Sequence, residues 1–175
     1  MRKKIFLDLM AVLTHPWECV FDEHSRVLIL GSFPSPKSRQ NGFYYGHPQN
    51  IFWKTLSFIL EKQQPANDKE SKIAFLLENR IALWDVLHSC AIEGALDSNI
   101  KNPVANKFRP LLNASSISTI FTTGKKATQL FQMLCSKEAG MNSVYLPSTS
   151  PANAKVHKSA NFLKHWESIA IALKN

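Results

Sequence analysis

Apolar residues in this chain are concentrated in four short runs, which are separated by longer stretches of mixed polarity. The runs occupy residues 26–31, 80–86, 117–123 and 142–147. Each is only a few residues long and is rich in branched or aromatic side chains, which is the pattern of a strand inside a sheet. We therefore predict four strands, and the run that ends at Gly31 reads as a buried parallel strand.

The stretches between these runs carry apolar residues at helical spacing. The predicted helices cover residues 50–62, 68–78, 124–136 and 160–173. The last of them places one apolar stripe on a single face, at Phe162, Trp166, Ile169 and Leu173. A stripe of this kind usually packs against the body of the protein, so we expect it in the core rather than at a binding site.

The alternation of strands and helices predicts the fold class. It is typical of α/β proteins, and we expect a three-layer α/β/α arrangement with a central four-stranded parallel sheet. Right-handed crossovers place the carboxyl ends of parallel strands at one edge of the sheet, where ligands of such folds bind. The loops that begin near Gly31, Asp85, Gly124 and Pro147 should therefore meet at that edge.

Length and charge narrow the range of functions. The chain has 175 residues without a linker or low-complexity tract, so we expect a single domain over residues 1–175. It carries 21 basic and 13 acidic residues, which gives a net charge of +8. This excess favours an anionic partner, most commonly nucleic acid, although many basic proteins bind none. We expect a monomer.

The cysteines and the N-terminus indicate a cytoplasmic protein. Cys19, Cys90 and Cys135 are widely separated, so they predict reduced thiols and neither a disulfide framework nor a metal site. Residues 1–13 resemble a signal peptide only briefly, because Asp8 interrupts the apolar run and no cleavage site follows. No segment approaches the length of a membrane span. Neither a metal nor an organic cofactor is implied.

The loop after the first predicted strand is the richest in chemistry. Residues 31–56 contain prolines, basic residues, three consecutive aromatics and several amides, which suit a flat base on a phosphate chain. Residues 31–38 nearly match the phosphate loop GxxxxGK[ST]. Pro36 replaces its second glycine, however, and both Pro34 and Pro36 lack the N–H group that such a loop uses to bind phosphate. A nucleotide triphosphatase is therefore disfavoured.

Three ordered motifs resemble the uracil-DNA glycosylase superfamily. They are GSFP at residues 31–34, FYYGHPQNIFWK at 43–54 and STSPAN at 148–153. The second is similar to the mismatch-specific branch, and the set is most similar to the hypoxanthine-DNA glycosylase family, also called DNA-deoxyinosine glycosylases. LWDV at 83–86 and GALDSNI at 94–100 resemble the same family. The resemblance spans most of the chain and implies the three-layer fold of that superfamily.

The resemblance also implies an activity. A monofunctional DNA glycosylase would flip a deaminated nucleotide, preferably deoxyinosine, out of the duplex and hydrolyse the bond to its base, leaving an abasic site. Its partner would be DNA that contains deaminated bases. The alternatives are a uracil- or xanthine-directed glycosylase of the same fold and a catalytically silent nucleic-acid-binding module.

Two positions depart from the superfamily pattern. Phe33 stands where related enzymes have the Asp or Asn that places the attacking water, so the resemblance assigns this catalytic role to Asn50. The oxygen of Asn50 can orient a water molecule, but Asn50 is also a suitable helix cap, and spacing alone favours the cap. The catalytic His of the classical last motif has no clear equivalent, and Ser148 sits near its place.

Asp85 takes the place of an Asn that reads uracil in related enzymes. As a carboxylate it can accept a hydrogen bond from N1–H of hypoxanthine, whereas burial could instead raise its pKa and make it a neutral donor. The sequence does not choose between the two. The other predicted base contacts come from the same edge of the sheet: Gly31, Ser32, Phe33 and Tyr45. For Tyr45, stacking on a flipped base and packing in the core are equally good interpretations.

The predicted DNA-binding residues follow the fourth strand. They are Ser148, Thr149, Ser150, Lys155 and Lys158. Hydroxyl and N–H groups in such a loop suit phosphate, although three hydroxyl residues can also form an ordinary turn. The two lysines follow this loop directly, so we expect them to contact phosphate rather than to be plain surface charges.

Overall fold

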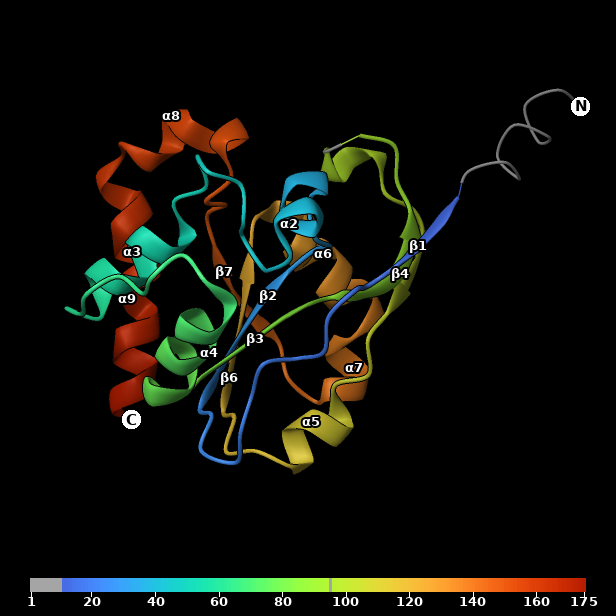
Figure 1. The fold of residues 1–175 in the computed structure, drawn as a ribbon. Helices are drawn as coiled ribbons and strands as arrows, with labels where there is room; N and C mark the ends of the chain where they lie inside the picture. The colour runs from blue at the N-terminus through green and yellow to red at the C-terminus, as the bar shows by residue number, and fades with distance from the viewer. Residues whose placement is uncertain (1–10, 95) are drawn as a thin grey trace, which may run out of the picture.

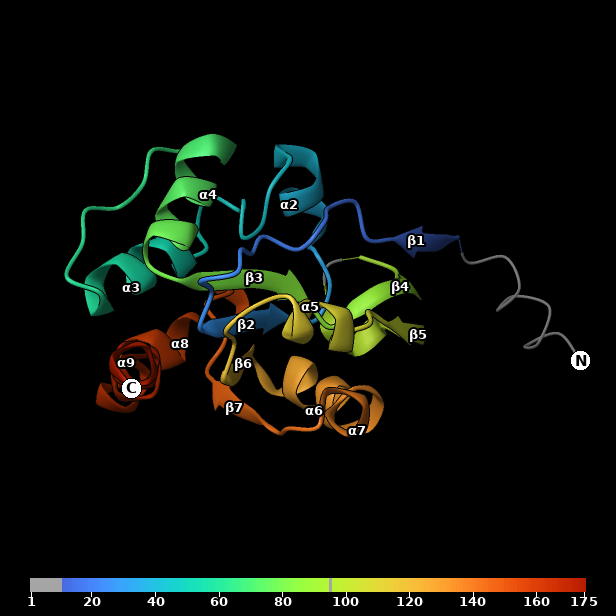
Figure 2. The ribbon, with the colours of Figure 1, turned by 90° about the horizontal axis from the view of Figure 1, so that it is seen from below.

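The structure is a computed structural model that describes residues 11–94 and 96–175. A four-stranded parallel sheet lies between two layers of helices (Figures 1 and 2). Its strands, in the order β3-β2-β6-β7, are β2 (Val27–Gly31), β3 (Ile81–Asp85), β6 (Thr119–Thr123) and β7 (Ser143–Leu146). The predicted α/β/α fold class is confirmed, and so are the four predicted strands.

The helices divide between the two faces of this sheet. One face is covered by α3 (Phe52–Ile59), α4 (Lys69–Glu78) and α9 (Ala160–Lys174), and the other by α5 (Arg109–Asn113), α6 (Lys125–Leu134) and α7 (Ser136–Ala139) (Figure 2). The shorter elements are α2 (Pro36–Asn41), α8 (Ala154–His157) and the 3₁₀ turns η1 (Asp97–Asn99) and η2 (Pro151–Asn153). The four predicted helices correspond to α3, α4, α6 and α9.

Strand β2 shows how the sequence creates two cores. Val27 and Ile29 point to one face of the sheet, and Leu28 and Leu30 point to the other; all four are fully buried. Each such side chain contributes roughly 1.5–3 kcal/mol when it leaves water. The predicted stripe of α9 packs in the first core, where Trp166 is fully buried. Its assignment to the core is confirmed.

A second, antiparallel sheet was not predicted. It consists of β1 (Val12–Thr14), β4 (Leu87–Ala91) and β5 (Lys101–Ala105), in the order β1-β4-β5. Strands β1 and β5 are short and largely exposed, so their sequences lack the continuous apolar run of a buried strand. The sheet matters for function, because β1 carries the following residue, His15, to the end of β3.

Three further predictions concern membrane-spanning segments, the state of the cysteines and a signal peptide. No helix among the described residues has the length and apolar character needed to cross a membrane. The three cysteines are free thiols, and burial raises the pKa of Cys90 to about 11 and that of Cys135 to about 12. The prediction that no signal peptide is present concerns residues 1–13, of which residues 1–10 lie outside the described residues, and it stays a prediction.

Candidate functional site

The carboxyl ends of the four parallel strands lie at one edge of the sheet, at the top of Figure 1. Two backbone hydrogen bonds join the loops there: Val86 N–H donates to the carbonyl of Gly31 over 2.8 Å, and Gly124 N–H donates to the carbonyl of Leu146 over 2.7 Å. The predicted meeting of the four loops is therefore confirmed.

Three predicted base contacts come together at the centre of this edge. The Asp85 carboxylate lies directly over the Cα of Gly31, so that a Cβ at Gly31 would collide with Asp85 Oδ1. The same Cβ would lie 3.2 Å from the hydroxyl of Tyr45. Only glycine leaves room for both groups at this position. Asp85 is itself anchored through its backbone carbonyl, which accepts a hydrogen bond of 2.9 Å from Asn106 Nδ2.

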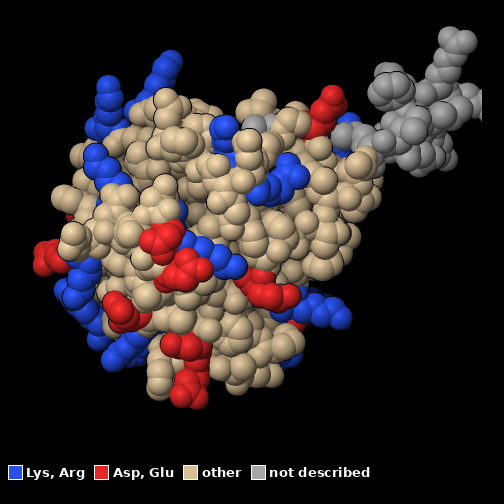
Figure 3. Space-filling model, in the orientation of Figure 1, with Lys and Arg blue, Asp and Glu red and all other residues tan. Residues whose placement is uncertain are grey.

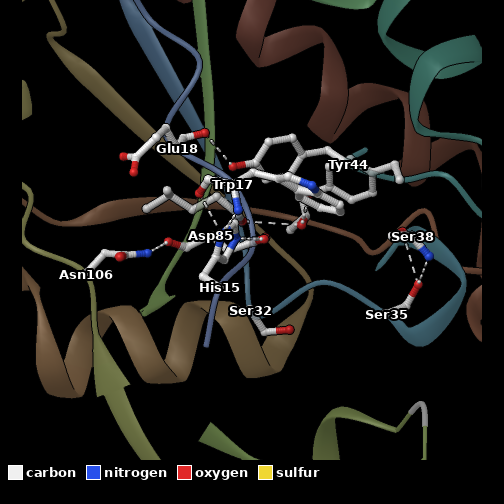
Figure 4. A network of polar contacts seen from close by, with 12 residues as sticks. His15, Trp17, Glu18, Ser32, Ser35, Ser38, Tyr44, Asp85 and Asn106 are labelled. Atoms are coloured by element: carbon white, nitrogen blue, oxygen red, sulfur yellow. Dashed lines mark hydrogen bonds and ion pairs between the residues drawn. The ribbon is translucent and has the colours of Figure 1, made fainter. Parts of the chain in front are cut away.

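Asp85 is paired with a histidine that the sequence did not reveal. His15 Nε2 lies 2.7 Å from Asp85 Oδ2, and the two side chains are only 2% and 5% exposed (Figure 4). The ring of His15 packs against the rings of Phe33 and Tyr44, with centroids 5.9 and 5.8 Å away. No hydrogen bond from a described residue reaches the other oxygen of Asp85, Oδ1. One acceptor atom is thus left at the edge of the sheet.

Tyr45 has one covered face and one bonded hydroxyl. Its ring stacks on Phe52 at 3.9 Å with an angle of 4° between the planes. Its hydroxyl lies 2.9 Å from the hydroxyl of Thr123, and burial raises the pKa of the phenol, which stays neutral. The core-packing interpretation is confirmed for the face on Phe52. Only the opposite face is left to stack on a base.

Ser32 and Phe33 are fixed by neighbours in the small sheet and its connections. The Ser32 hydroxyl donates to Asp97 Oδ1 over 2.8 Å. Burial raises the pKa of Asp97 and the charge of Asp85 adds to the rise, while the Ser32 bond and Lys126 oppose it. Phe33 is buried in the second core. It fills space there, and its contact with a base stays a prediction.

Asn50 lies directly before the N-cap residue of α3 and bonds to the first turn of that helix. Its Oδ1 accepts a hydrogen bond of 2.9 Å from the N–H of Phe52, the first residue of α3. The N-cap residue of α3 is Ile51, so the prediction that Asn50 is the cap is wrong by one position; Asn50 instead satisfies one of the N–H groups that the first turn leaves without a helical partner. The catalytic role stays a prediction, and the side chain retains the atoms for it: a carboxamide oxygen has a second lone pair, and Nδ2 has no hydrogen bond to the described residues.

The loop after β7 lies next to Asn50, since Ile51 N–H donates to the carbonyl of Thr149 over 3.2 Å. Within the loop, the Ser148 hydroxyl accepts from Ser150 N–H at 3.2 Å and the Ser150 hydroxyl accepts from Ala152 N–H at 3.3 Å. These bonds confirm a turn. Thr149 differs, because its hydroxyl is buried without a hydrogen-bond partner among the described residues. Whether the three hydroxyls contact DNA stays a prediction.

Lys155 and Lys158 are exposed on and just after the short helix α8, which borders the same edge. Within residues 11–94 and 96–175, neither lysine forms an ion pair with a carboxylate. Figure 3 shows basic side chains projecting at the upper left, where α8 lies in Figure 1. Their charges are therefore available to an anionic ligand at this edge.

Known proteins are similar to this chain over most of its length. The family model described as the uracil DNA glycosylase superfamily matches residues 19–174. The chain belongs to this superfamily. The resemblance of the sequence to this superfamily is thereby confirmed. The substrate of the chain is DNA.

Two relatives within the superfamily are named hypoxanthine DNA glycosylase. The protein from Methanosarcina acetivorans is 34% identical over 151 residues, which cover 86% of this chain and 93% of the relative. The protein from Methanosarcina barkeri is 34% identical over 141 residues, which cover 80% and 88%. The solution NMR structure of a Methanosarcina acetivorans protein named for uracil DNA glycosylase superposes with a TM-score of 0.76 and 31% identity, covering 94% of this chain and 100% of that one.

Proposed function

We propose that this protein is a monofunctional DNA glycosylase that releases hypoxanthine from deoxyinosine in DNA and leaves an abasic site. The observation that carries the proposal is the fixed Asp85 carboxylate at the carboxyl edge of the sheet, with one unused acceptor oxygen. It occurs in a chain that is 34% identical, over 86% of its length, to a hypoxanthine DNA glycosylase.

The free oxygen of Asp85 distinguishes the damaged base from its parent. Hypoxanthine carries a hydrogen at N1, whereas adenine carries a lone pair at the same atom. An acceptor such as Asp85 Oδ1 attracts the N1 hydrogen of hypoxanthine and repels the N1 lone pair of adenine. Recognition of the lesion therefore requires N1, and not O6, of the flipped base to face Asp85.

The bond to the base breaks with positive charge developing on the sugar and negative charge on the departing base. The DNA phosphates around the site offset the sugar cation. Asn50 orients the water that attacks the sugar, and backbone N–H groups of the loop after Gly31 stabilise the leaving base. Among the described residues, no lysine at the site is placed as a nucleophile, so water completes the reaction and no strand cleavage follows.

Replacing Asp85 with asparagine tests base recognition. The Asp85→Asn variant should release hypoxanthine about 10- to 100-fold more slowly, since a buried polar contact is lost. It should release uracil faster than the parent, because an amide can donate to a uracil carbonyl. Single-turnover rates on both substrates measure the change. Unchanged hypoxanthine release together with inert uracil would show that Asp85 does not read the base.

The two lysines near α8 test the DNA-binding surface. Replacing Lys155 or Lys158 with alanine should weaken binding to all sequences alike and reduce the slope of log affinity against log salt by about one for each lost phosphate contact. Lys174→Ala is the matched control, because Lys174 is exposed at the other end of α9. An unchanged salt slope in both test variants would show that these lysines are solvated surface charges that do not contact phosphate.

A panel of duplexes that differ in a single lesion tests the proposed function against its alternatives. Inosine should be the preferred substrate over uracil and xanthine in a single-turnover base-release assay. Faster release of uracil or xanthine would support the alternative specificity. Tight lesion binding without release of any base would support the silent binding module. The single-domain organisation, the monomeric state and the cytoplasmic location stay predictions.

A further inference from the structure

The two oxygens of the Asp85 carboxylate have different surroundings. Oδ2 lies 2.7 Å from His15 Nε2 in a nearly buried contact, while Oδ1 lies over Gly31 without a donor among the described residues. Figure 4 shows His15 and Asp85 side by side, below the aromatic rings of Trp17 and Tyr44 in this view. The two oxygens are therefore not equivalent toward a ligand.

The position of the protons follows from the other nitrogen of His15. Nδ1 lies 2.8 Å from the carbonyl oxygen of Trp17 and 3.2 Å from its backbone nitrogen. A protonated Nδ1 donates to the carbonyl, and an unprotonated one accepts from the N–H. Either arrangement is compatible with a proton between Nε2 and Oδ2, where the contact is short. Oδ1 is then left as an acceptor only.

The imidazole cannot easily leave this position. The backbone N–H of His15 donates to the carbonyl of His88 over 2.7 Å, which ties it to β4. Its ring is enclosed by Trp17, Phe33 and Tyr44, whose centroids all lie within 6 Å. Oδ2 therefore stays occupied while a base binds.

A single free acceptor has a consequence for guanine, which is present throughout undamaged DNA. Guanine and hypoxanthine share O6 and N1–H, and guanine adds a 2-amino group beside N1. A carboxylate with two free oxygens binds that pair of donors in a bidentate manner and would favour guanine. With Oδ2 bonded to His15, the 2-amino group of guanine can reach only an acceptor that it must share with the imidazole N–H, and that first bond weakens the second lone pair and fixes the orientation of the carboxylate.

We propose that His15 is a positioning residue that determines specificity: by bonding to Asp85 Oδ2 it leaves Oδ1 as the one oxygen of this carboxylate without a donor among the described residues, which fits the single N1–H of hypoxanthine and disfavours the two adjacent donors of guanine. The inference rests on the proposed function and on the base-reading role of Asp85. His15 does not touch the base in this account and acts through the carboxylate.

Three variants of His15 separate this role from a structural one. His15→Leu keeps the bulk of the side chain and removes the donor. His15→Asn keeps a polar side chain, but its amide reaches only the position of Nδ1. His15→Gln extends an amide N–H to the position of Nε2 and restores the contact with Oδ2. The Leu and Asn variants should therefore behave alike, and the Gln variant should behave like the parent.

The readout is the preference for hypoxanthine over guanine. It is measured as the ratio of single-turnover release from duplexes with inosine or guanine opposite thymine, and as the ratio of inhibition by the two free bases. Loss of one charged hydrogen bond should lower both ratios about tenfold in the Leu and Asn variants. The Gln variant should return to within about threefold of the parent.

Two results would overturn the inference, and they differ from failure of the proposed function. The first is a slower release with an unchanged preference in both donor-lacking variants, which would make His15 a structural residue only. The second is a lowered preference that the Gln variant does not restore. If the parent releases no hypoxanthine at all, the proposed function itself has failed. Thermal melting of each variant identifies any that do not fold, and either donor-lacking variant then suffices.

Discussion

Asn50→Ala should lower the single-turnover rate of hypoxanthine release about 10²- to 10³-fold while duplex affinity stays unchanged. This is the cost of removing one well-placed polar group from the transition state of a reaction that depends on positioned dipoles. DNA affinity depends mainly on phosphate contacts, which Asn50 does not supply in this account. Base release and binding are measured on the same inosine duplex.

The hydrogen bond between Asn50 and the first turn of α3 requires a matched control. Its Oδ1 accepts from Phe52 N–H, so the alanine variant should also lose about 1 kcal/mol in the free energy of unfolding. Asn50→Ser keeps a capping oxygen but lacks the carboxamide. Asn50→Ser should restore the free energy of unfolding of the parent but not its rate of base release. If serine restores base release together with stability, Asn50 only stabilises the first turn of α3.

The second large effect is expected for Gly31→Ala. The added Cβ would collide with Asp85 Oδ1 and approach the Tyr45 hydroxyl to 3.2 Å. The carboxylate cannot simply rotate away, because His15 holds its other oxygen. A displacement of this kind at a reading group should lower the rate of hypoxanthine release about 10²-fold. Circular dichroism and thermal melting of the variant show whether the fold is retained.

A double variant tells whether this effect passes through Asp85. Asp85→Ala removes the carboxylate and leaves space for a Cβ at Gly31. Adding Gly31→Ala in that background should therefore change the rate little, so the two substitutions should be strongly non-additive. Full additivity would mean that Gly31 acts on the reaction by a route other than Asp85.

The parallel sheet could be predicted because three of its strands, β2, β3 and β6, are buried on both faces. Their sequences read as short apolar runs such as the one at residues 27–30, and the alternation with helical stretches then fixes the layers. The order of the strands could not be predicted, because β2 pairs with β3 on one side and with the distant β6 on the other. The approach of Asp85 to Gly31 follows from that pairing, in which the two residues are register partners.

The sequence predicted those site residues that lie in recognisable motifs. It missed the contacts that form only when segments far apart in the chain pair with each other. His15 and Asp85 are 70 residues apart, and only the pairing of β1 with β4 brings them together. The one local signal is the sequence His15-Pro16-Trp17, a titratable group flanked by an aromatic residue in an otherwise unremarked segment. Asp97 lies within a motif of the family resemblance, yet no pattern indicated its bond to Ser32.

Product analysis on a duplex with a single inosine tests the central claim most directly. Under single-turnover conditions with the unmodified protein, we expect one equivalent of free hypoxanthine per duplex by chromatography. The DNA strand should remain uncut, with an abasic site that breaks only on treatment with alkali. A folded protein that binds this duplex and releases no hypoxanthine would contradict the account.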